Sequence, residues 1–385
     1  MKYCLRPLSL NPVYRRLPLM KYRGRILCLL LCFFALSCVK ASPGVTSRPY
    51  LSQVTNDSIV VTWRTAIPTS SVVEYGETTA YGFTVKSDMT TRFHCLCLTG
   101  LKPSMEYHYR VRSENGGKDY TFHTAVKPGE AFTFAVYGDS QPNDENHVNV
   151  LRQILKVRPL FILHTGDLVH HDEENDWHDY FRAICDETDV GETIPVYAVM
   201  GNHDGVEHGE DALFLSYLVL PLNHFLRSEG YYSFNIGDAH FIALNSYLPY
   251  EPGSPQYEWL ANDLRKSSAY KWKFVFLHEP PYSTGKHGSN ISERRVLCPL
   301  FEKASVDIVF AGHNHLYERT REINGVTYIV TGGGGAPLYD AEKMYWIAAS
   351  ESSHHFCKVH ISQNLCAVEM IREDGTISDK FTMLR

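Results

Sequence analysis

The 385-residue sequence predicts two domains, an all-β sandwich followed by an α/β domain in which a β-sandwich is flanked by helices. Short segments rich in β-branched and aromatic residues recur between residues 48 and 125, with turn residues between them. From Phe132 onward, apolar segments alternate with segments of helical periodicity, which is typical of sheets covered by helices. Polar clusters follow the apolar segments of this second part, where ligands gather in such sheets.

The first 41 residues are excluded from the predicted fold. Residues 26–36 form an apolar run preceded by basic residues, which is typical of a secretory signal. A membrane anchor is the alternative, although the run is short for a span. Two processing sites fit the sequence: cleavage after Ala41, or a lipobox-like site that would make Cys38 a lipid anchor. Met20 is a candidate true start, and we expect an exported protein, either secreted or lipid-anchored at the cell surface or in the periplasm.

Residues 44–125 have the pattern of a separate all-β unit. Leu98–Pro103 followed by an alternating strand over Tyr107–Arg112 resembles a fibronectin type III module, which typically serves as a spacer or docking unit. Residues 126–130 contain Pro and Gly and are interpreted as a linker. The predicted strands of this unit are Ser58–Trp63, Pro68–Tyr75, Tyr107–Arg112 and Tyr120–Thr124.

Residues 131–385 form the predicted α/β domain. Ser254 is the expected N-cap of a helix with Pro255 at its first position. A hairpin over Tyr231–Asn245 turns at Gly237 and Asp238. Further helices are expected over residues 143–157 and 293–304. The predicted strands are Phe132–Tyr137, Leu160–Leu163, Ile194–Met200, Trp272–Leu277 and Val306–Phe310.

Charge and cysteine content restrict the function. A net charge of −6 argues against a nucleic-acid-binding surface, which is usually basic. The cysteines show no C-x-x-C zinc spacing. Cys95 and Cys97 share one face of a strand, so we do not expect them to bond to each other. Cys357 and Cys366 flank a predicted hairpin and either form a disulfide or remain buried thiols.

A polar cluster follows each of the five predicted strands. His313 and His315 are two residues apart, and two neutral imidazoles at this spacing suit a divalent transition metal. Turn formation and capping explain any one cluster, but not five at successive strand ends. The clusters are Gly138–Gln141, Gly166–His170, Gly201–Asp204, His278 and Gly312–His315.

Together these clusters resemble the motifs of the calcineurin-like metallophosphoesterase superfamily, and more narrowly those of the purple acid phosphatases. Val275–Tyr282, Gly312–Arg319 and Thr331–Pro337 carry the narrower resemblance. The fibronectin-like unit before the α/β domain also matches that family's layout. The resemblance covers nearly everything after residue 44 and implies a phosphoesterase with two metal ions, which clamp a phosphate and activate water.

The resemblance implies a role for each cluster. Asp167 would bridge the two metals, with Asp139 and His315 on the first. His203 would contact the phosphate and aid the leaving group, and Asp204 would orient the His203 imidazole. The remaining implied residues are Asn202, His278 and His313 as ligands of the second metal, and His287 facing the substrate, with Lys286 a weaker candidate.

Two departures from the family pattern affect the first metal. His170 stands where purple acid phosphatases have the tyrosine whose phenolate gives the colour. Gln141 stands where other members of the superfamily have a metal-binding histidine. His170 is the first choice as the side ligand, and Gln141 is the alternative, either as a ligand or as a contact to the substrate. A colourless enzyme containing Zn, Mn or Fe, divalent or mixed-valence, is therefore expected.

Three functions fit the sequence. The first is a secreted or surface-attached phosphomonoesterase that acts on small phosphorylated substrates. The second is a phosphodiesterase or nucleotide hydrolase, because one fold hosts several such activities. The third is a non-catalytic surface protein that binds a phosphorylated ligand.

Overall fold

The computed structural model describes residues 45–112, 117–141, 145–222 and 229–385. The predicted leader, including Met20 and Cys38, lies outside these residues. Within the described ranges, no helix is both long enough and apolar enough to cross a membrane.

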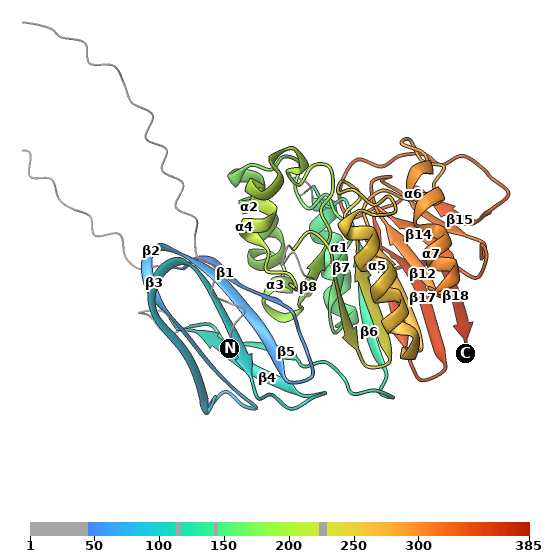
Figure 1. Cartoon of the computed structure of the whole chain (residues 1–385). Coiled ribbons are helices and arrows are strands. Elements are labelled where there is room, and N and C mark those ends of the chain that lie inside the picture. Colours follow the sequence, from blue (N-terminus) through green and yellow to red (C-terminus); the bar gives the residue numbers. More distant parts are fainter. Residues whose placement is uncertain (1–44, 113–116, 142–144, 223–228) are drawn as a thin grey trace, which may run out of the picture.

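The N-terminal part is an all-β unit, as predicted (Figure 1). Its long second strand pairs with β3 along one edge, and with β1 and then β4 along the other. The five strands therefore form one hydrogen-bonded network bent around the second strand. They are β1 (Val45–Ser52), β2 (Ser58–Gly76), β3 (Phe83–Thr99), β4 (Glu106–Val111) and β5 (Tyr120–His123).

The second part is built on two mixed sheets. The six-stranded sheet has the order β18 (Ile377–Leu384), β17 (Leu365–Arg372), β16 (His355–Ile361), β6 (Phe132–Tyr137), β7 (Ile162–His164) and β8 (Val196–Ala198). The seven-stranded sheet has the order β15 (Ile347–Glu351), β13 (Tyr317–Thr320), β14 (Thr327–Thr331), β12 (Ile308–Ala311), β11 (Trp272–Phe276), β10 (Ala239–Ala243) and β9 (Tyr232–Ile236).

Phenylalanine side chains join the two sheets face to face. Phe134 of β6 makes edge-on contacts with Phe241 and Phe274 of the other sheet, at ring-centroid distances of 5.2 and 5.4 Å. Phe134 has no solvent exposure. Aromatic rings prefer such edge-to-face geometry, and their burial supplies much of the core's stability. The layered α/β domain predicted from the alternation of segments is thus confirmed.

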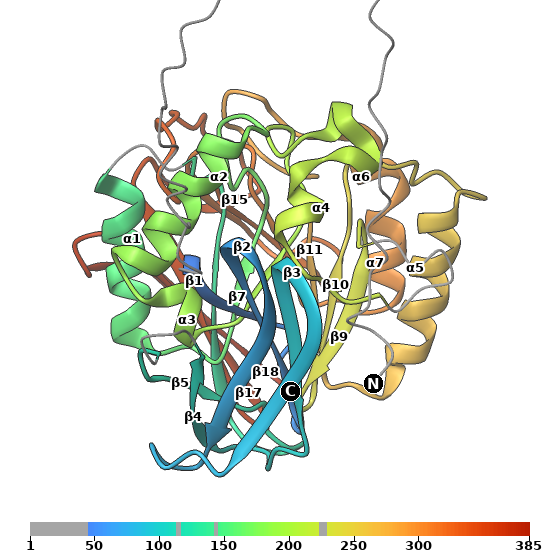
Figure 2. The same ribbon diagram turned by 90° about the vertical axis from the view of Figure 1, so that its left-hand side faces the viewer.

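Helices cover the outer faces of both sheets (Figure 2). Leu151 and Ile154 of α1 are buried in the same core as the six-stranded sheet. Leu260 of α5 and Phe301 of α7 pack against the seven-stranded sheet in a second core. The helices are α1 (Glu145–Val157), α2 (Glu174–Phe181), η1 (Arg182–Asp186), α3 (Val190–Thr193), η2 (Val206–Asp211), α4 (Leu213–Tyr217), α5 (Pro255–Lys266), η3 (Ser267–Ala269), α6 (Ile291–Val296) and α7 (Cys298–Lys303).

Local sequence signals explain several of these boundaries. The Ser254 hydroxyl accepts a hydrogen bond from the Tyr257 amide at 3.4 Å, so the predicted cap of α5 is present. The predicted hairpin is β9 and β10, with Gly237 at a φ of 54° in its turn. The single helix predicted over residues 293–304 is wrong. Two short helices, α6 and α7, replace it, because Pro299 at the start of α7 cannot donate a helical hydrogen bond.

The alternative of a disulfide between Cys357 and Cys366 is also wrong. Cys357 of β16 lies opposite Met370, whereas Cys366 of β17 lies opposite Ile361. The two residues are therefore far apart along the ladder, and both are buried free thiols.

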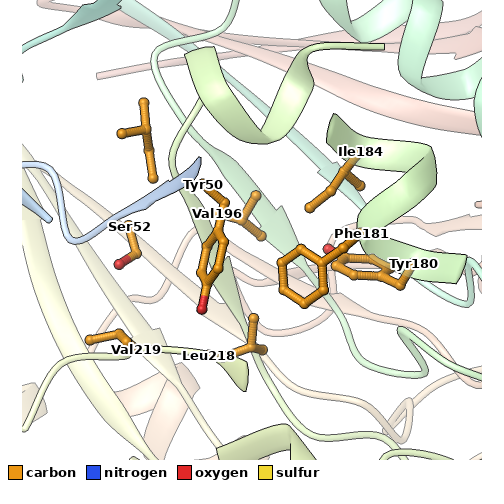
Figure 3. A pocket seen from close by; sticks show the side chains of 9 residues that line it. Tyr50, Ser52, Tyr180, Phe181, Ile184, Val196, Leu218 and Val219 are labelled. Atoms are coloured by element: carbon orange, nitrogen blue, oxygen red, sulfur yellow. The ribbon is translucent and has the colours of Figure 1, made fainter. Parts of the chain in front are cut away.

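The all-β unit docks on β8 and on the helical segment that follows β7. Arg48 donates to Asp189 at 2.9 Å, and the Tyr197 hydroxyl donates to the Val54 carbonyl at 3.0 Å. A pocket of about 10 Å³ lies at this junction, lined largely by apolar side chains including Tyr50 and Phe181 (Figure 3). Its volume corresponds to about one water molecule, so it is too small for a substrate.

Candidate metal centre

The predicted ligands lie in loops at the carboxyl ends of parallel strands. Strands β6, β7 and β8 are parallel to one another, as are β11 and β12. Parallel strands bring their carboxyl ends to one edge of a sheet. The loops carry Asp139 after β6, Asp167 after β7, Asn202 after β8, His278 after β11, and His313 and His315 after β12.

These loops bring together two groups of side chains that share Asp167. One group is Asp167, His278 and His313, and the other is Asp139, Asp167 and His315. Within each group, the potential ligand atoms all lie within 4.8 Å of one another. A carboxylate has two oxygens and can hold one metal with each, so the shared Asp167 has the position of a bridge.

Asn202 completes the group that contains His278 and His313. Its Oδ1 lies 3.1 Å from His278 Nε2 and 2.9 Å from His313 Nδ1, and Asp167 Oδ1 lies 3.5 Å from His278 Nε2. Ligand atoms placed about 2.1 Å from one metal ion lie about 3.0–3.4 Å from each other. The separations fit a single ion held by four side chains.

The orientation of His278 supports the same conclusion. Its Nδ1 lies 2.8 Å from the Thr165 carbonyl oxygen, which can only accept, so Nδ1 carries the proton. In the neutral ring, Nε2 then presents a lone pair to the Asn202 oxygen. Two lone pairs facing each other at 3.1 Å do not form a hydrogen bond, and a cation between them would satisfy both.

His315 is oriented toward Asp139 in the same way. Its Nδ1 donates to the Pro337 carbonyl at 2.7 Å, and its Nε2 lies 3.6 Å from Asp139 Oδ1. Burial lowers the pKa of His315 to about 4 and the pKa values of His278 and His313 to about 3. The three rings are therefore neutral and can each donate a lone pair to a metal.

The two carboxylates also favour bound cations. Asp139 and Asp167 are buried, and burial raises the pKa of both, with the charge of Asp167 raising that of Asp139 further. Divalent cations would reverse both shifts. Both oxygens of Asp139 accept from the His313 amide at 3.0 Å, which aims the carboxylate into the site.

Glycines provide the space that the carboxylates occupy. A Cβ on Gly201 would lie 2.1 Å from Asp167 Oδ1, and a Cβ on Gly312 would lie 2.4 Å from Asp139 Oδ2. The backbone of Asp139, Asp167 and His313 adopts φ angles of 58°, 54° and 66°. Non-glycine residues rarely take this left-handed conformation, which costs free energy and is concentrated at functional sites.

His203, the residue expected to contact the phosphate, lies beside Asp167. Its amide donates to Asp167 Oδ1 at 2.9 Å, and its Nε2 lies 3.9 Å from Asp167 Oδ2. Its side chain is partly exposed. His203 therefore stands at the open edge of the two groups rather than inside either of them.

The predicted role of Asp204 is wrong, because its carboxylate turns away from the His203 ring. Its oxygens accept hydrogen bonds from four backbone amides, and the Nδ1 of His203 instead lies 2.8 Å from the His170 carbonyl oxygen. Asp204 thus joins the loop that carries Asp167 to the loop that carries Asn202. The four donors are the amides of Asp167 (2.8 Å), Leu168 (2.9 Å), Val169 (3.3 Å) and Gly201 (2.8 Å).

The structure does not support His170 as the side ligand of the first metal. Its side chain is exposed and belongs to neither group, and its ring lies nearly parallel to that of His203. The alternative candidate, Gln141, is 9% exposed, and its Nε2 has no hydrogen-bond partner among the described residues. A buried amide without a partner is unfavourable unless something else binds it. An amide nitrogen donates a hydrogen bond and does not ligate a cation, so this atom suits a contact to a phosphoryl oxygen, whereas ligation would use the Gln141 carbonyl oxygen. Gln141 stays the alternative candidate for this position.

His287, the residue expected to face the substrate, lies next to His313. Its ring centroid is 4.3 Å from that of His313, and its side chain is exposed. Lys286 turns toward Tyr339, with its Nζ 4.8 Å from the ring centroid. The loop is held by Asn314, whose Oδ1 accepts from the His287 amide at 2.8 Å.

Three residues near the ligands were not predicted. Asn314 stands between the two histidines of the H-x-H pattern, and this position was the only signal for it. Tyr247 lies in the loop after β10 and donates to Asn202 Oδ1 at 3.4 Å. Tyr339 stacks on His315 at a centroid distance of 4.2 Å. The two tyrosines lie in loops that match no recognised sequence motif, so the sequence did not indicate that they contact the site.

Comparison with known proteins agrees with this geometry. The family described as "Calcineurin-like phosphoesterase" matches residues 132–317, and the family described as "Purple acid Phosphatase, N-terminal domain" matches residues 47–124. Together they span the all-β unit and the loops from Asp139 to His315.

Individual proteins show the same relationship. The chain is 33% identical to purple acid phosphatase 21 of Arabidopsis thaliana over 318 residues, which are 74% of this chain and 70% of the relative. It is 29% identical to a phosphoenolpyruvate phosphatase of Allium cepa over 328 residues, covering 77% of this chain and 67% of the relative. The structure of the purple acid phosphatase PPD1 from yellow lupin (Lupinus luteus) seeds has a TM-score of 0.77, at 23% identity, over 89% of this chain and 75% of that one. The chain belongs to the purple acid phosphatase family.

Proposed function

We propose that this protein hydrolyses small phosphomonoesters at a dinuclear metal centre built from the two groups that share Asp167. Membership of the family makes it a metal-dependent phosphoric ester hydrolase. The observation that supports phosphomonoester hydrolysis at this centre is the position of His203. It lies at the open edge of both groups, with its Nε2 3.9 Å from Asp167 Oδ2. A phosphoryl group placed there would meet both metals and an imidazole.

The residues fit two ions. Asp139, Asp167 and His315, with Gln141 as the fourth candidate, would hold the first. Two bound ions would polarise the phosphoryl group and lower the pKa of a bound water for in-line attack. The second ion would be held by Asp167, Asn202, His278 and His313.

The chain's own residues would orient the substrate. The His170 carbonyl accepts from His203 Nδ1, which directs Nε2 toward the site. When the ring carries a proton on both nitrogens, Nε2 can donate a hydrogen bond to a phosphoryl oxygen or its proton to the leaving oxygen. His287, beside His313, would contact the same phosphoryl group.

A small, anionic substrate is consistent with this arrangement. One relative is named as a phosphatase of phosphoenolpyruvate, which is a small phosphomonoester. Lys286 and His287 lie in one loop at the rim and could contact a negatively charged leaving group.

A single substitution tests the role of His203. We expect His203→Ala to keep both metals, because no ligand is lost, and to lower kcat by about 10²- to 10⁴-fold, the usual contribution of a general acid or base. His178→Ala is the matched control, since its exposed ring lies in α2 and pairs with Glu174 at 3.9 Å. Loss of metal from the His203 variant would contradict the proposed role.

Export of the protein is also part of the proposal. It rests on the basic and apolar leader of residues 21–36. Mass spectrometry of the mature N-terminus after expression in the native host tests it. A terminus at Ser42 would support secretion, a lipidated Cys38 would support a surface anchor, and an uncleaved leader would contradict both.

A further inference from the structure

The rings of His170 and His203 form a pair at the edge of the metal centre. Their centroids are 5.4 Å apart, and their planes differ by 14°. His170 also touches the next residue, with its ring edge-on to that of His171 at 4.3 Å. The His170 side chain is thus fixed between two neighbours although it is exposed to solvent.

The main chain of His170 contacts the same imidazole. Its carbonyl oxygen lies 2.8 Å from His203 Nδ1 and can only accept, so that nitrogen carries a proton. One residue therefore contacts His203 twice: the carbonyl fixes which nitrogen faces the site, and the ring lies nearly parallel beside the imidazole.

We propose that His170 is a positioning residue that holds the His203 imidazole against the open edge of the metal centre. This inference rests on the proposed function of His203. It differs from the metal-binding role expected for this position from the family pattern, since the His170 ring belongs to neither ligand group.

The inference predicts an effect on turnover without an effect on metal content. Aromatic contacts of this kind are worth about 0.5–1.5 kcal/mol, which corresponds to about a 2- to 10-fold change in rate. We expect His170→Ala to lower kcat by that factor, because the His203 ring loses its neighbour. KM should stay within about 2-fold, because the metals that bind the phosphoryl group are retained.

His170→Phe separates positioning from metal binding. Phenylalanine keeps a flat ring beside His203 but offers no lone pair to a metal. We expect this variant to recover most of the kcat lost in His170→Ala, with two metals still bound. His178→Ala is the control, because His178 is another exposed histidine and lies in α2 near Glu174.

A measurement on metal-free protein gives a readout independent of turnover. The proton NMR signals of the His203 ring are identified by their absence in His203→Ala. The ring current of a nearly parallel ring 5.4 Å away displaces them, so they should move toward the positions of an isolated imidazole in His170→Ala and keep or increase their displacement in His170→Phe.

The outcomes are distinguishable. Unchanged kcat and unchanged His203 signals in His170→Ala would overturn the inference. Loss of about one metal from both His170 variants would also overturn it, in favour of a ligand role. If the wild-type protein lacks turnover, the proposed function fails, but the NMR comparison still decides whether His170 positions the ring.

Discussion

Replacing Asp204 by asparagine tests how the two central loops are joined. The buried carboxylate accepts four backbone hydrogen bonds, two to each oxygen. Asparagine keeps one oxygen, which can accept from Leu168 and Val169. Its amide nitrogen would then face the amides of Asp167 and Gly201, which are both donors. Two buried amides would lose their acceptor, at a cost of about 1–3 kcal/mol each.

A second effect acts in the opposite direction. Burial and the neighbouring charge of Asp167 raise the pKa of Asp204, which means that the charged carboxylate is destabilised in the folded protein. Replacing it by a neutral amide removes this destabilisation and offsets part of the loss. The two lost hydrogen bonds would together cost about 2–6 kcal/mol. We therefore expect a loss of stability in the lower part of this range, about 2–4 kcal/mol. For a domain of about 250 residues this corresponds to a decrease in Tm of about 4–8 °C, at roughly 2 °C per kcal/mol.

The assay is thermal unfolding of chelator-treated protein, because bound metal would itself stabilise the fold. Asp176→Asn is the control, since Asp176 accepts one backbone hydrogen bond, from His171 at 2.7 Å. Its expected effect is below about 1 kcal/mol. If Asp204→Asn unfolds within about 1 °C of the wild type while kcat collapses, Asp204 acts through His203 after all and the structural account is refuted.

Three further predictions concern other parts of the molecule. Gly312→Ala should displace Asp139, because the added methyl group would lie 2.4 Å from Asp139 Oδ2, and elemental analysis should show about one bound ion fewer per chain. Full metal occupancy would contradict this contact between Gly312 and Asp139. Burial raises the pKa of Glu192 from its ordinary value of 4.5 to about 8, so the stability it contributes is complete below pH 4.5 and is lost as the pH rises to about 8. Glu192→Gln should therefore make Tm less dependent on pH between pH 4.5 and about 8. If Tm changes equally with pH in the variant and the wild type, Glu192 does not have the raised pKa. A thiol reagent should leave Cys357 and Cys366 unmodified until the protein is unfolded, and a disulfide-linked peptide in mass spectrometry would contradict the strand register.

Much of the fold followed from contiguous patterns. The strand at Phe132–Tyr137 has the predicted bounds, because a strand buried on both faces is a nearly continuous apolar run. The capped helix after Ser254 also followed from its sequence signal. The break between α6 and α7 was missed, although Pro299 indicated it.

The site was predictable where a ligand directly follows a strand and less so elsewhere. Asp139, Asp167, His278, His313 and His315 meet because the strands before them are parallel neighbours or belong to the packed sheets. Side-chain direction was not predictable, because adjacency in sequence does not decide it. Asp204 follows His203 but turns back to the backbone amides. His170 occupies a family ligand position, yet its ring lies beside His203.

The most direct test of the account is metal content measured together with ester preference. Protein lacking residues 1–41 would be analysed for bound metals, and its turnover of p-nitrophenyl phosphate and of the bis ester would be compared with and without added Mn, Zn and Fe. The account predicts about two ions per chain, no visible tyrosinate band and preference for the monoester. Binding of about one ion or none would contradict the shared role of Asp167, and preference for the diester would contradict the proposed substrate class.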